Sequence, residues 1–355
     1  MSDQPGSDGT MRAWRLHQYG EPRDVLQLDT VPIPEPEKGE IRVRNEGIPM
    51  NLNDLERING GNMMVVPELP TCPGMEVFGV VDACGAGAEA WQGKRIAATT
   101  KQAIGGYADF TICQTSSVFE MPDDLPFPDA AAVFFPFHLA WLGLFDRADL
   151  QAGESVLIHA AAGGSGSAAV QLAANAGARV FATAGTEEKL ALCRELGADV
   201  TINYNEASFF DVVMAETQNR GVDVVFDNVG AAVFDDSLKA TAYNGRYVMM
   251  GAASDKTKVD EPFVVPRRVI AGNMKLCGAI LSYAQPEVVP FVKQAMGFNF
   301  ATRDLGQKIN DSVIELLRAK KVRTVIGQVC SFDQIPDAID ALASRKTVGR
   351  VIATV

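Results

Sequence analysis

The residues best suited to chemistry form a glycine-rich turn near the middle of the chain. A short apolar run at 155–158 leads into Ala161-x-Gly163-x-x-Gly166, and an alanine-rich stretch follows. A dinucleotide site needs small residues in such a turn, because the backbone must approach a diphosphate and the next helix must pack closely on the strand. The diphosphate then lies at a helix N-terminus, where free N–H groups and the helix dipole favour an anion. The same pattern would arise from close packing alone. Its position between a strand and a helix favours dinucleotide binding, through Ala162, Gly163, Gly164, Ser165 and Gly166.

The end of the next apolar run indicates which dinucleotide is bound. The run 179–183 ends in Ala184-Gly185-Thr186, with no acidic residue at its tip. A ribose 2′-hydroxyl is usually bound by Asp or Glu at this point, whereas a 2′-phosphate requires that acid to be absent and donors or cations to be present. Lys189 and Tyr204 can supply them, although Lys189 would equally suit a surface pair with Glu188. The sequence therefore predicts NADPH rather than NADH. The predicted contacts are Gly185, Thr186, Lys189 and Tyr204 at the 2′-phosphate, and Asn228, Gly251 and Arg350 elsewhere along the cofactor.

The elements that must position these residues change character near residue 150. Before about residue 130, short alternating or β-branched runs bounded by Gly and Pro predict a β-rich region. From 155 onward, apolar strands alternate with helical stretches, which predicts a parallel sheet covered on both faces. Residues 286–355 carry two amphipathic helical stretches and end in an apolar strand. The expected fold class is therefore α/β, with a β-rich second domain.

Composition excludes several functional classes. The chain has 355 residues with a formal net charge of −12, which argues against binding a polyanion such as nucleic acid. Its apolar runs are shorter than the ~20 residues that span a bilayer. Residues 1–10 are polar and acidic, unlike a signal peptide, and are expected to be a disordered tail. The six cysteines are scattered without a C-x-x-C pair, which fits reduced thiols and a cytoplasmic location.

Several short motifs together resemble the medium-chain dehydrogenase/reductase superfamily, and within it the zinc-independent quinone oxidoreductase (zeta-crystallin-like) branch. The resemblance rests on Asn51-Leu52-Asn53-Asp54, Pro73-Gly74-Met75-Glu76, Gly105-Gly106-Tyr107-Ala108, Ala162-Gly163-Gly164-Ser165-Gly166, Asp227-Asn228-Val229-Gly230 and Val348-Gly349-Arg350-Val351. It implies a GroES-like catalytic domain formed by residues 11–135 and 286–355, and a Rossmann domain formed by residues 136–285. It also implies NADPH-dependent reduction of quinones or of C=C bonds conjugated to a carbonyl, usually in a homodimer. An enoyl-CoA or enoyl-ACP reductase and an NADPH-binding structural or regulatory protein remain open alternatives.

The resemblance also bears on metal binding. Zinc-dependent members of the superfamily have ligands at the positions that Asn51, Met75 and Phe135 occupy here. An amide, a thioether and a phenyl ring do not form a zinc site, which takes thiolate, imidazole or carboxylate ligands. No metal is expected. Without a Lewis acid, a conjugated acceptor is favoured over a simple carbonyl, because its charge spreads after hydride addition.

The catalytic side chains are less clear than the cofactor site. Relatives carry a Tyr near Glu56 or near Asn62, and a Thr at the position of Leu139. Asn51 is the remaining catalytic candidate, because its amide can hydrogen-bond a substrate oxygen or the nicotinamide ribose, or else serve the turn structurally. His138 either compensates for Leu139 or packs in the core, and the core is the favoured interpretation.

Two segments in the second half have predicted packing roles. The strand-like run 273–278 lies where relatives extend the sheet across a dimer, which indicates a homodimer. The apolar stretch 288–299 either caps a substrate pocket or is buried, and burial is the favoured interpretation.

Overall fold

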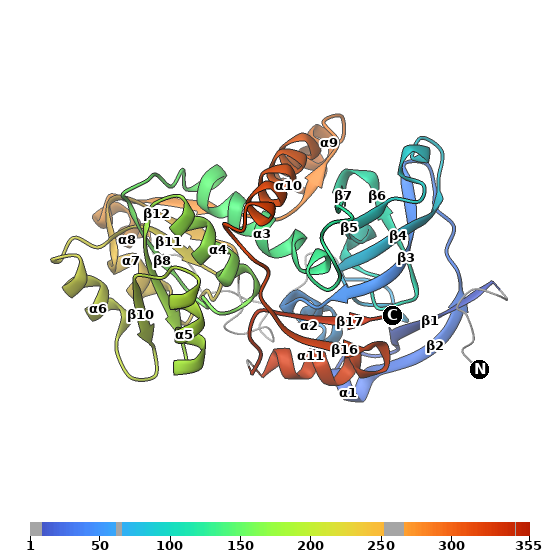
Figure 1. Cartoon of the computed structure of the whole chain (residues 1–355), viewed down its shortest axis with the longest axis horizontal. Helices are drawn as coiled ribbons and strands as arrows, with labels where there is room; N and C mark the ends of the chain where they lie inside the picture. The colour runs from blue at the N-terminus through green and yellow to red at the C-terminus, as the bar shows by residue number, and fades with distance from the viewer. Residues whose placement is uncertain (1–8, 62–65, 252–265, 345) are drawn as a thin grey trace.

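The structure is a computed structural model that describes residues 9–61, 66–251, 266–344 and 346–355. Most of the expected tail, residues 1–10, and Asn62 lie outside these ranges. Two sheets form the two ends of the molecule, and a long helical segment crosses between them (Figure 1). No helix within these ranges is long and apolar enough to span a membrane.

The β-rich part combines both ends of the chain in one sheet. In the described residues its strands run in the order β16-β17-β3-β4-β5-β7, with β6 paired to β3. The bounds are β3 (Glu40–Pro49), β4 (Glu76–Cys84), β5 (Arg95–Thr99), β6 (Phe110–Gln114), β7 (Val118–Glu120), β16 (Ile326–Ser331) and β17 (Arg350–Thr354). β17 pairs antiparallel with β3, so the C-terminal residues lie beside strands formed about 300 residues earlier. A separate pair, β1 (Thr10–Leu16) and β2 (Leu26–Pro32), packs near it.

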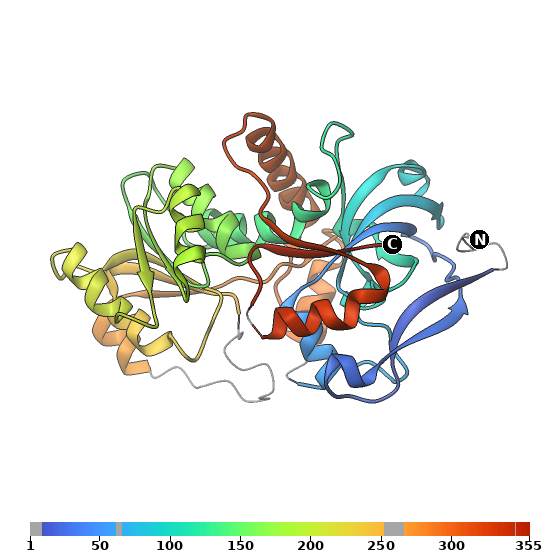
Figure 2. The same ribbon diagram turned by 60° about the horizontal axis from the view of Figure 1, so that its bottom comes forward.

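Three helices cover one side of this region. They are α1 (Pro22–Val25), α2 (Leu52–Asn59) and α11 (Ile335–Ala343). Figure 2 shows α11, in red, lying beneath the terminal strands and beside the blue N-terminal helices. Ile58 of α2 and Ile335 and Ile339 of α11 are fully buried in one cluster, so α2 is held against α11.

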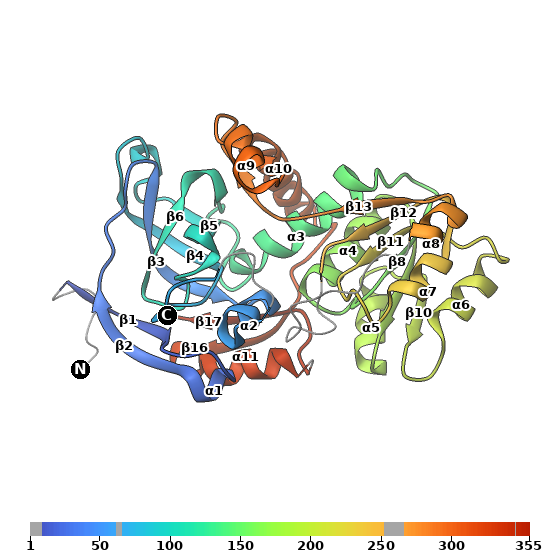
Figure 3. The same cartoon turned by 180° about the vertical axis from the view of Figure 1, so that it is seen from behind.

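The other part is a parallel sheet with helices on both faces. Its described strands run in the order β10-β9-β8-β11-β12-β13, and every neighbouring pair is parallel. The strands are β8 (Ser155–Ile158), β9 (Arg179–Ala184), β10 (Val200–Asn203), β11 (Val222–Asp227), β12 (Thr241–Met249) and β13 (Lys275–Gly278). The helices are α4 (Gly164–Asn175), α5 (Glu187–Glu195), α6 (Phe209–Glu216), α7 (Phe234–Lys239) and α8 (Pro266–Gly272) (Figure 3). The strand order reverses between β8 and β11, and such a reversal opens a crevice at the carboxyl ends of the strands. The predicted fold class is confirmed.

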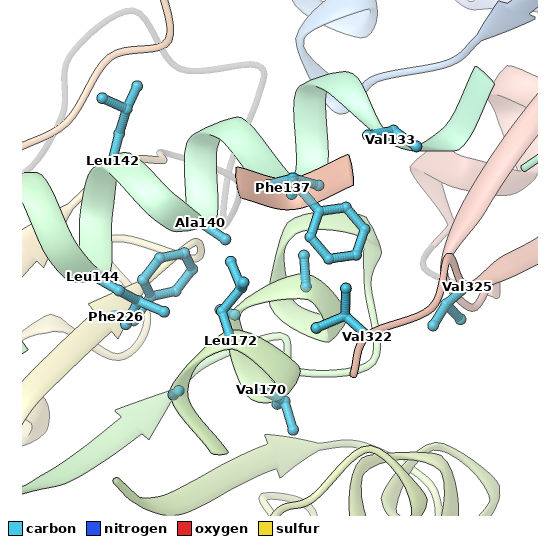
Figure 4. Packing of buried hydrophobic residues seen from close by; sticks show 14 of the residues in the cluster. Val133, Phe137, Ala140, Leu142, Leu144, Val170, Leu172, Phe226, Val322 and Val325 are labelled. Atoms are coloured by element: carbon cyan, nitrogen blue, oxygen red, sulfur yellow. The ribbon is translucent and has the colours of Figure 1, made fainter. Parts of the chain in front are cut away.

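A shared hydrophobic core joins the two parts. α3 (Phe134–Trp141) continues as π-helical turns over Leu142–Arg147 and packs on α4 and on α10 (Arg303–Arg318). Figure 4 shows Phe137 and Ala140 of α3 with Leu172 of α4, Phe226 of β11 and Val322. The same cluster includes Phe78 and Phe119 from the β-rich sheet. This common core fixes how the two parts pack against each other. The boundaries at 135/136 and 285/286 stay predictions.

His138 of α3 belongs to this core, as the favoured interpretation proposed. It is fully buried, its Nδ1 lies 2.9 Å from the Tyr283 hydroxyl, and its ring contacts Phe119 and Phe134. Burial lowers the pKa of His138 to about 3, so the ring is neutral at physiological pH. A neutral, enclosed imidazole facing Tyr283 does not compensate for Leu139.

The favoured interpretation of 288–299 as buried is wrong. α9 (Val289–Met296) connects β14 (Tyr283–Ala284) with β15 (Ala301–Thr302), and none of its residues is buried. Phe291 is 69% exposed and Met296 is 45% exposed. The apolar pattern had indicated one packed face, but in the isolated chain that face lies on the surface.

Candidate functional site

The glycine-rich turn joins β8 to α4 at the carboxyl edge of the parallel sheet. Its glycines differ in what they permit. A Cβ on Gly166 would lie 2.2 Å from the Ala160 carbonyl oxygen, so this residue must be glycine for α4 to pack on the strand. A Cβ on Gly163 would come only within 3.3 Å of the same oxygen. Helix packing therefore explains why residue 166 is glycine, but it does not explain why residue 163 is. The close approach of a diphosphate to the backbone would explain Gly163.

The residues expected at the 2′-phosphate gather at one corner, where β9 and β10 end. A Cβ on Gly185 would lie 2.5 Å from the Tyr204 hydroxyl oxygen. The Tyr204 hydroxyl can therefore occupy this position only because residue 185 has no side chain. Thr186 caps α5, since its Oγ1 accepts a hydrogen bond from the Lys189 backbone N–H at 3.3 Å. Tyr204 is 51% exposed and therefore accessible to a ligand. Glu187 in the same turn is paired with Arg194 at 2.6 Å, which offsets its negative charge.

Asn228 and Gly251 lie at the ends of the central strands β11 and β12. A Cβ on Gly251 would lie 2.8 Å from the Asn228 carbonyl oxygen. The loop after β11 is shaped by Asp227, which accepts hydrogen bonds from the backbone of Val229 and Gly230 and from Tyr247. Burial raises the pKa of Asp227, although these donors oppose the rise. Sequence reasoning missed the role of Asp227, whose signal was its place at the end of an apolar strand.

A second buried histidine stabilises the strand end before the turn. Both ring nitrogens of His159 form hydrogen bonds with hydroxyl groups. Nδ1 lies 3.1 Å from Thr183 Oγ1, and Nε2 lies 2.8 Å from Ser237 Oγ. Burial lowers the pKa of His159 to about 3. The next residue, Ala160, has a φ of +51°, a conformation that non-glycine residues adopt only where neighbours enforce it. The hydrogen bonds of His159 therefore hold the strand at the point where the turn begins.

A buried ionic cluster lies where the two parts meet. Arg350 of β17 donates hydrogen bonds to Glu76 of β4 and, through Nη1, to Asn51 Oδ1 at 2.9 Å. Asn51 Nδ2 donates to Glu76 Oε2 at 3.0 Å, and the Phe135 backbone N–H donates to Glu76 Oε1 at 3.2 Å. We call Arg350, Glu76 and Asn51 the buried cluster. Burial raises the pKa of Glu76, while the neighbouring guanidinium of Arg350 opposes that rise. The motif Pro73-Gly74-Met75-Glu76 includes Glu76 but does not predict that its carboxylate binds these two residues.

Arg350 also reaches the glycine-rich turn. The Gly349 backbone N–H donates to the Ala162 carbonyl at 2.8 Å, and a Cβ on Gly164 would lie 2.9 Å from Arg350 Cδ. Arg350 Nε is buried and has no hydrogen-bond partner among the described residues. Buried N–H groups are nearly always satisfied, and this one lies beside a helix N-terminus suited to anions. The structure therefore leaves one buried donor beside this helix N-terminus without an acceptor among the described residues.

Asn51 has little free hydrogen-bonding capacity in this arrangement. Its Oδ1 accepts from Arg350, and its Nδ2 donates to Glu76 and weakly, at 3.4 Å, to the Pro49 carbonyl. Its backbone N–H donates to Asp54 Oδ2 at 2.9 Å, which caps α2. A catalytic role for Asn51 stays a prediction and would require one of these bonds to be exchanged.

The three positions at which zinc-dependent relatives have ligands do lie together. Asn51 and the backbone of Phe135 contact Glu76 directly, and Met75 precedes it in the chain. The donors present are an amide already bound to Arg350, a buried thioether and a phenyl ring, which do not fit zinc. Within the described ranges, no group of three or more His, Cys, Asp or Glu residues is arranged to hold a metal.

Comparisons with protein families match both parts of the chain. Residues 37–123 match the family described as "Alcohol dehydrogenase GroES-like domain". Residues 164–294 match the family described as "Zinc-binding dehydrogenase". The second description names a metal for which the donors at Asn51, Met75 and Phe135 are unsuited.

Individual proteins similar to this chain include quinone oxidoreductases. The quinone oxidoreductase of Pongo abelii is 33% identical over 246 residues, covering 68% of this chain and 73% of that protein. A mycobacterial protein solved in complex with NADPH is 30% identical, with a TM-score of 0.83 over 97% of this chain and 100% of the other. A quinone oxidoreductase of Pseudomonas syringae pv. Tomato DC3000 is 26% identical with the same TM-score and coverage.

The glycine-rich turn gives a test that separates packing from ligand binding. Gly166→Ala should lower the free energy of unfolding by about 1–3 kcal/mol, because the added methyl group overpacks rigid backbone. Gly163→Ala should lower it by less, and should instead weaken NADPH binding. Chemical denaturation and nicotinamide fluorescence measure the two effects. A Gly166→Ala protein as stable as the wild type would show that the packing is looser than the structure indicates.

Proposed function

Because the chain belongs to the medium-chain dehydrogenase/reductase superfamily and, within it, to the quinone oxidoreductases, we propose that it transfers hydride from NADPH to a quinone or an α,β-unsaturated carbonyl compound without zinc. The observation that carries the proposal is the unpartnered Arg350 Nε beside the glycine-rich turn. A buried cation with an unused donor, at a helix N-terminus, suits the diphosphate of a dinucleotide.

The residues present fit NADPH at both ends of its adenosine diphosphate portion. Gly163, Gly164 and Arg350 would hold the diphosphate, with the Arg350 Nε, which has no partner among the described residues, as one of the donors. Lys189 and Tyr204 would hold the 2′-phosphate at the corner formed with Gly185. When bound, the nicotinamide supplies the hydride.

The protein's own residues would orient the reactants and stabilise the charge that develops on the acceptor. The shared core fixes the relative position of the two parts, which favours correct alignment of cofactor and acceptor. Asn51 is our candidate to hydrogen-bond the acceptor oxygen, through Nδ2 in exchange for its weak 3.4 Å bond to the Pro49 carbonyl. A conjugated acceptor suits this site, because its negative charge is delocalised and needs hydrogen bonds rather than a metal ion.

A second candidate function is supported by one observation. The Asn51 amide already bonds to Arg350, to Glu76 and weakly to Pro49, and the Tyr and Thr of relatives are absent from Glu56 and Leu139. A protein that binds NADPH but turns it over negligibly, in a regulatory or structural role, would have such a site. Fold alone does not decide between the two.

An acceptor screen tests the reaction directly. Purified protein should oxidise NADPH with a quinone or an enone, and a chelator should leave the rate unchanged, since no described group of side chains suits a metal. Absorbance of NADPH follows the reaction with a quinone, an enone and crotonyl-CoA in parallel. A preference for crotonyl-CoA in kcat/KM would indicate an enoyl thioester reductase. Binding without turnover would support the second candidate, and loss of activity on chelation would contradict the proposal.

The 2′-phosphate assignment predicts a specific change in cofactor preference. Lys189→Ala should raise the KM for NADPH by about tenfold or more and leave the KM for NADH nearly unchanged, because it removes one charge-assisted contact. Tyr204→Phe should act in the same direction with a smaller effect. Lys308→Ala, on the exposed face of α10, is the matched control. Equal increases in both KM values would place the 2′-phosphate elsewhere.

We also propose a homodimer formed along β13. This strand is the edge of the parallel sheet in the described part of the chain, and an unpaired edge can bind a second strand. Two apolar side chains near this strand, Tyr243 and Ile270, are each 73% exposed. The segments that carry them meet at the backbone hydrogen bond from the Asn244 N–H to the Asn273 carbonyl. Sedimentation equilibrium should give twice the chain mass of 38.0 kDa, and Ile270→Asp should lower it. A wild-type monomer at micromolar concentration would rule out this assembly.

A further inference from the structure

Three helices begin close to the buried cluster. Asn51 is the N-cap of α2, the Phe135 N–H at the start of α3 donates to Glu76, and Gly164 is the first residue of α4 beside Arg350. Helix N-termini carry partial positive charge, so a carboxylate among them is stabilised. Glu76 is 1% exposed and is the carboxylate that binds both Arg350 and Asn51.

The side chain of Arg350 lies between the Asn51 amide and the glycine-rich turn. Its Nη1 holds the Asn51 amide and its Nη2 binds Glu76. Its Nε has no partner among the described residues, and its Cδ lies against Gly164 at the glycine-rich turn. A planar guanidinium has its donors in fixed directions, so a change in the position of one donor moves the others.

We propose that Glu76 is a positioning residue that aims Arg350, so that one guanidinium receives the cofactor diphosphate through Nε and aligns the Asn51 amide through Nη1. This inference rests on the proposed function, because it requires NADPH at the turn. It adds a link between the diphosphate and the Asn51 amide. Glu76 itself would contact neither cofactor nor substrate.

The charges give the proposal a distinctive consequence. Glu76 neutralises Arg350, and therefore reduces the attraction between Arg350 and an anionic diphosphate. Removing the carboxylate charge should leave NADPH binding equal or tighter, while the misaligned Asn51 amide lowers turnover. A purely structural role for Glu76 predicts something else, namely lower stability with Kd and kcat of the folded protein altered little or impaired together.

The test compares Glu76→Gln with a matched ion-pair variant, Glu154→Gln. Glu154 pairs with Arg246 at 2.5 Å just before β8, at the opposite end of that strand from the glycine-rich turn. NADPH Kd is measured by nicotinamide fluorescence, and kcat with the best acceptor at saturating NADPH. Glu76→Gln should keep or lower Kd and reduce kcat by about 10- to 100-fold, the range expected when a reacting group is misplaced. Glu154→Gln should change neither.

Two further variants keep the proposal testable if Glu76→Gln folds poorly. Glu76→Asp retains the charge and should recover part of kcat relative to Glu76→Gln. In an Arg350→Met background, Glu76→Gln should have no additional effect on NADPH Kd, because the link runs through Arg350.

Several outcomes would overturn the inference. They are a Glu76→Gln kcat within twofold of the wild type, a parallel loss of NADPH affinity and kcat, or an effect of Glu76→Gln on Kd that persists without Arg350. A different result would refute the proposed function itself, namely a wild-type protein that does not bind NADPH. Normal binding and turnover in both the wild type and Glu76→Gln would refute only the positioning role.

Discussion

The buried pair between Arg350 and Glu76 constrains much of the molecule. A buried charge is tolerated only where a partner and further hydrogen bonds compensate for its lost hydration. Arg350 is 5% exposed and Glu76 is 1% exposed, so the two must meet whenever the chain folds. Their contact brings the last strand onto the first large sheet and brings both against the start of α3. The surroundings of this pair are consequently formed by segments from both ends and the middle of the chain.

Backbone sterics impose the second constraint. Gly166 allows α4 to lie against the end of β8, and Gly185 leaves space for the Tyr204 hydroxyl. These two glycines permit the close contacts at the turn and at the corner where β9 and β10 end. Buried hydrogen bonds of His159 and Asp227 then hold the strand ends themselves. The proposed cofactor site therefore depends on packing as much as on residues that would contact the ligand.

The sequence predicted those features that depend on local pattern. Apolar runs such as 155–158 and 222–227 indicate strands buried on both faces, and the spacing of Ala161, Gly163 and Gly166 indicates a tight turn into a helix. The contact between Glu76 and Arg350 spans 274 residues and has no local signal. The periodicity of 288–299 shows that one face is apolar without showing what covers it, so burial was wrongly predicted for α9. For Asn51, residue type suggested a donor to substrate, and only the structure shows how its amide is already used.

The nature of the buried cation limits the chemistry that this site can support. A guanidinium stays protonated at all physiological pH values and has no vacant coordination position, unlike zinc. It cannot exchange a water ligand for a substrate oxygen, so its contribution under the proposed function is a fixed positive field and a set of directed N–H groups. Such a field suits a charge that spreads over a conjugated system, since no single oxygen then requires a direct cation contact. Under the proposed function, the unsuitability of Asn51, Met75 and Phe135 as zinc ligands and the preference for a conjugated acceptor would have the same electrostatic basis.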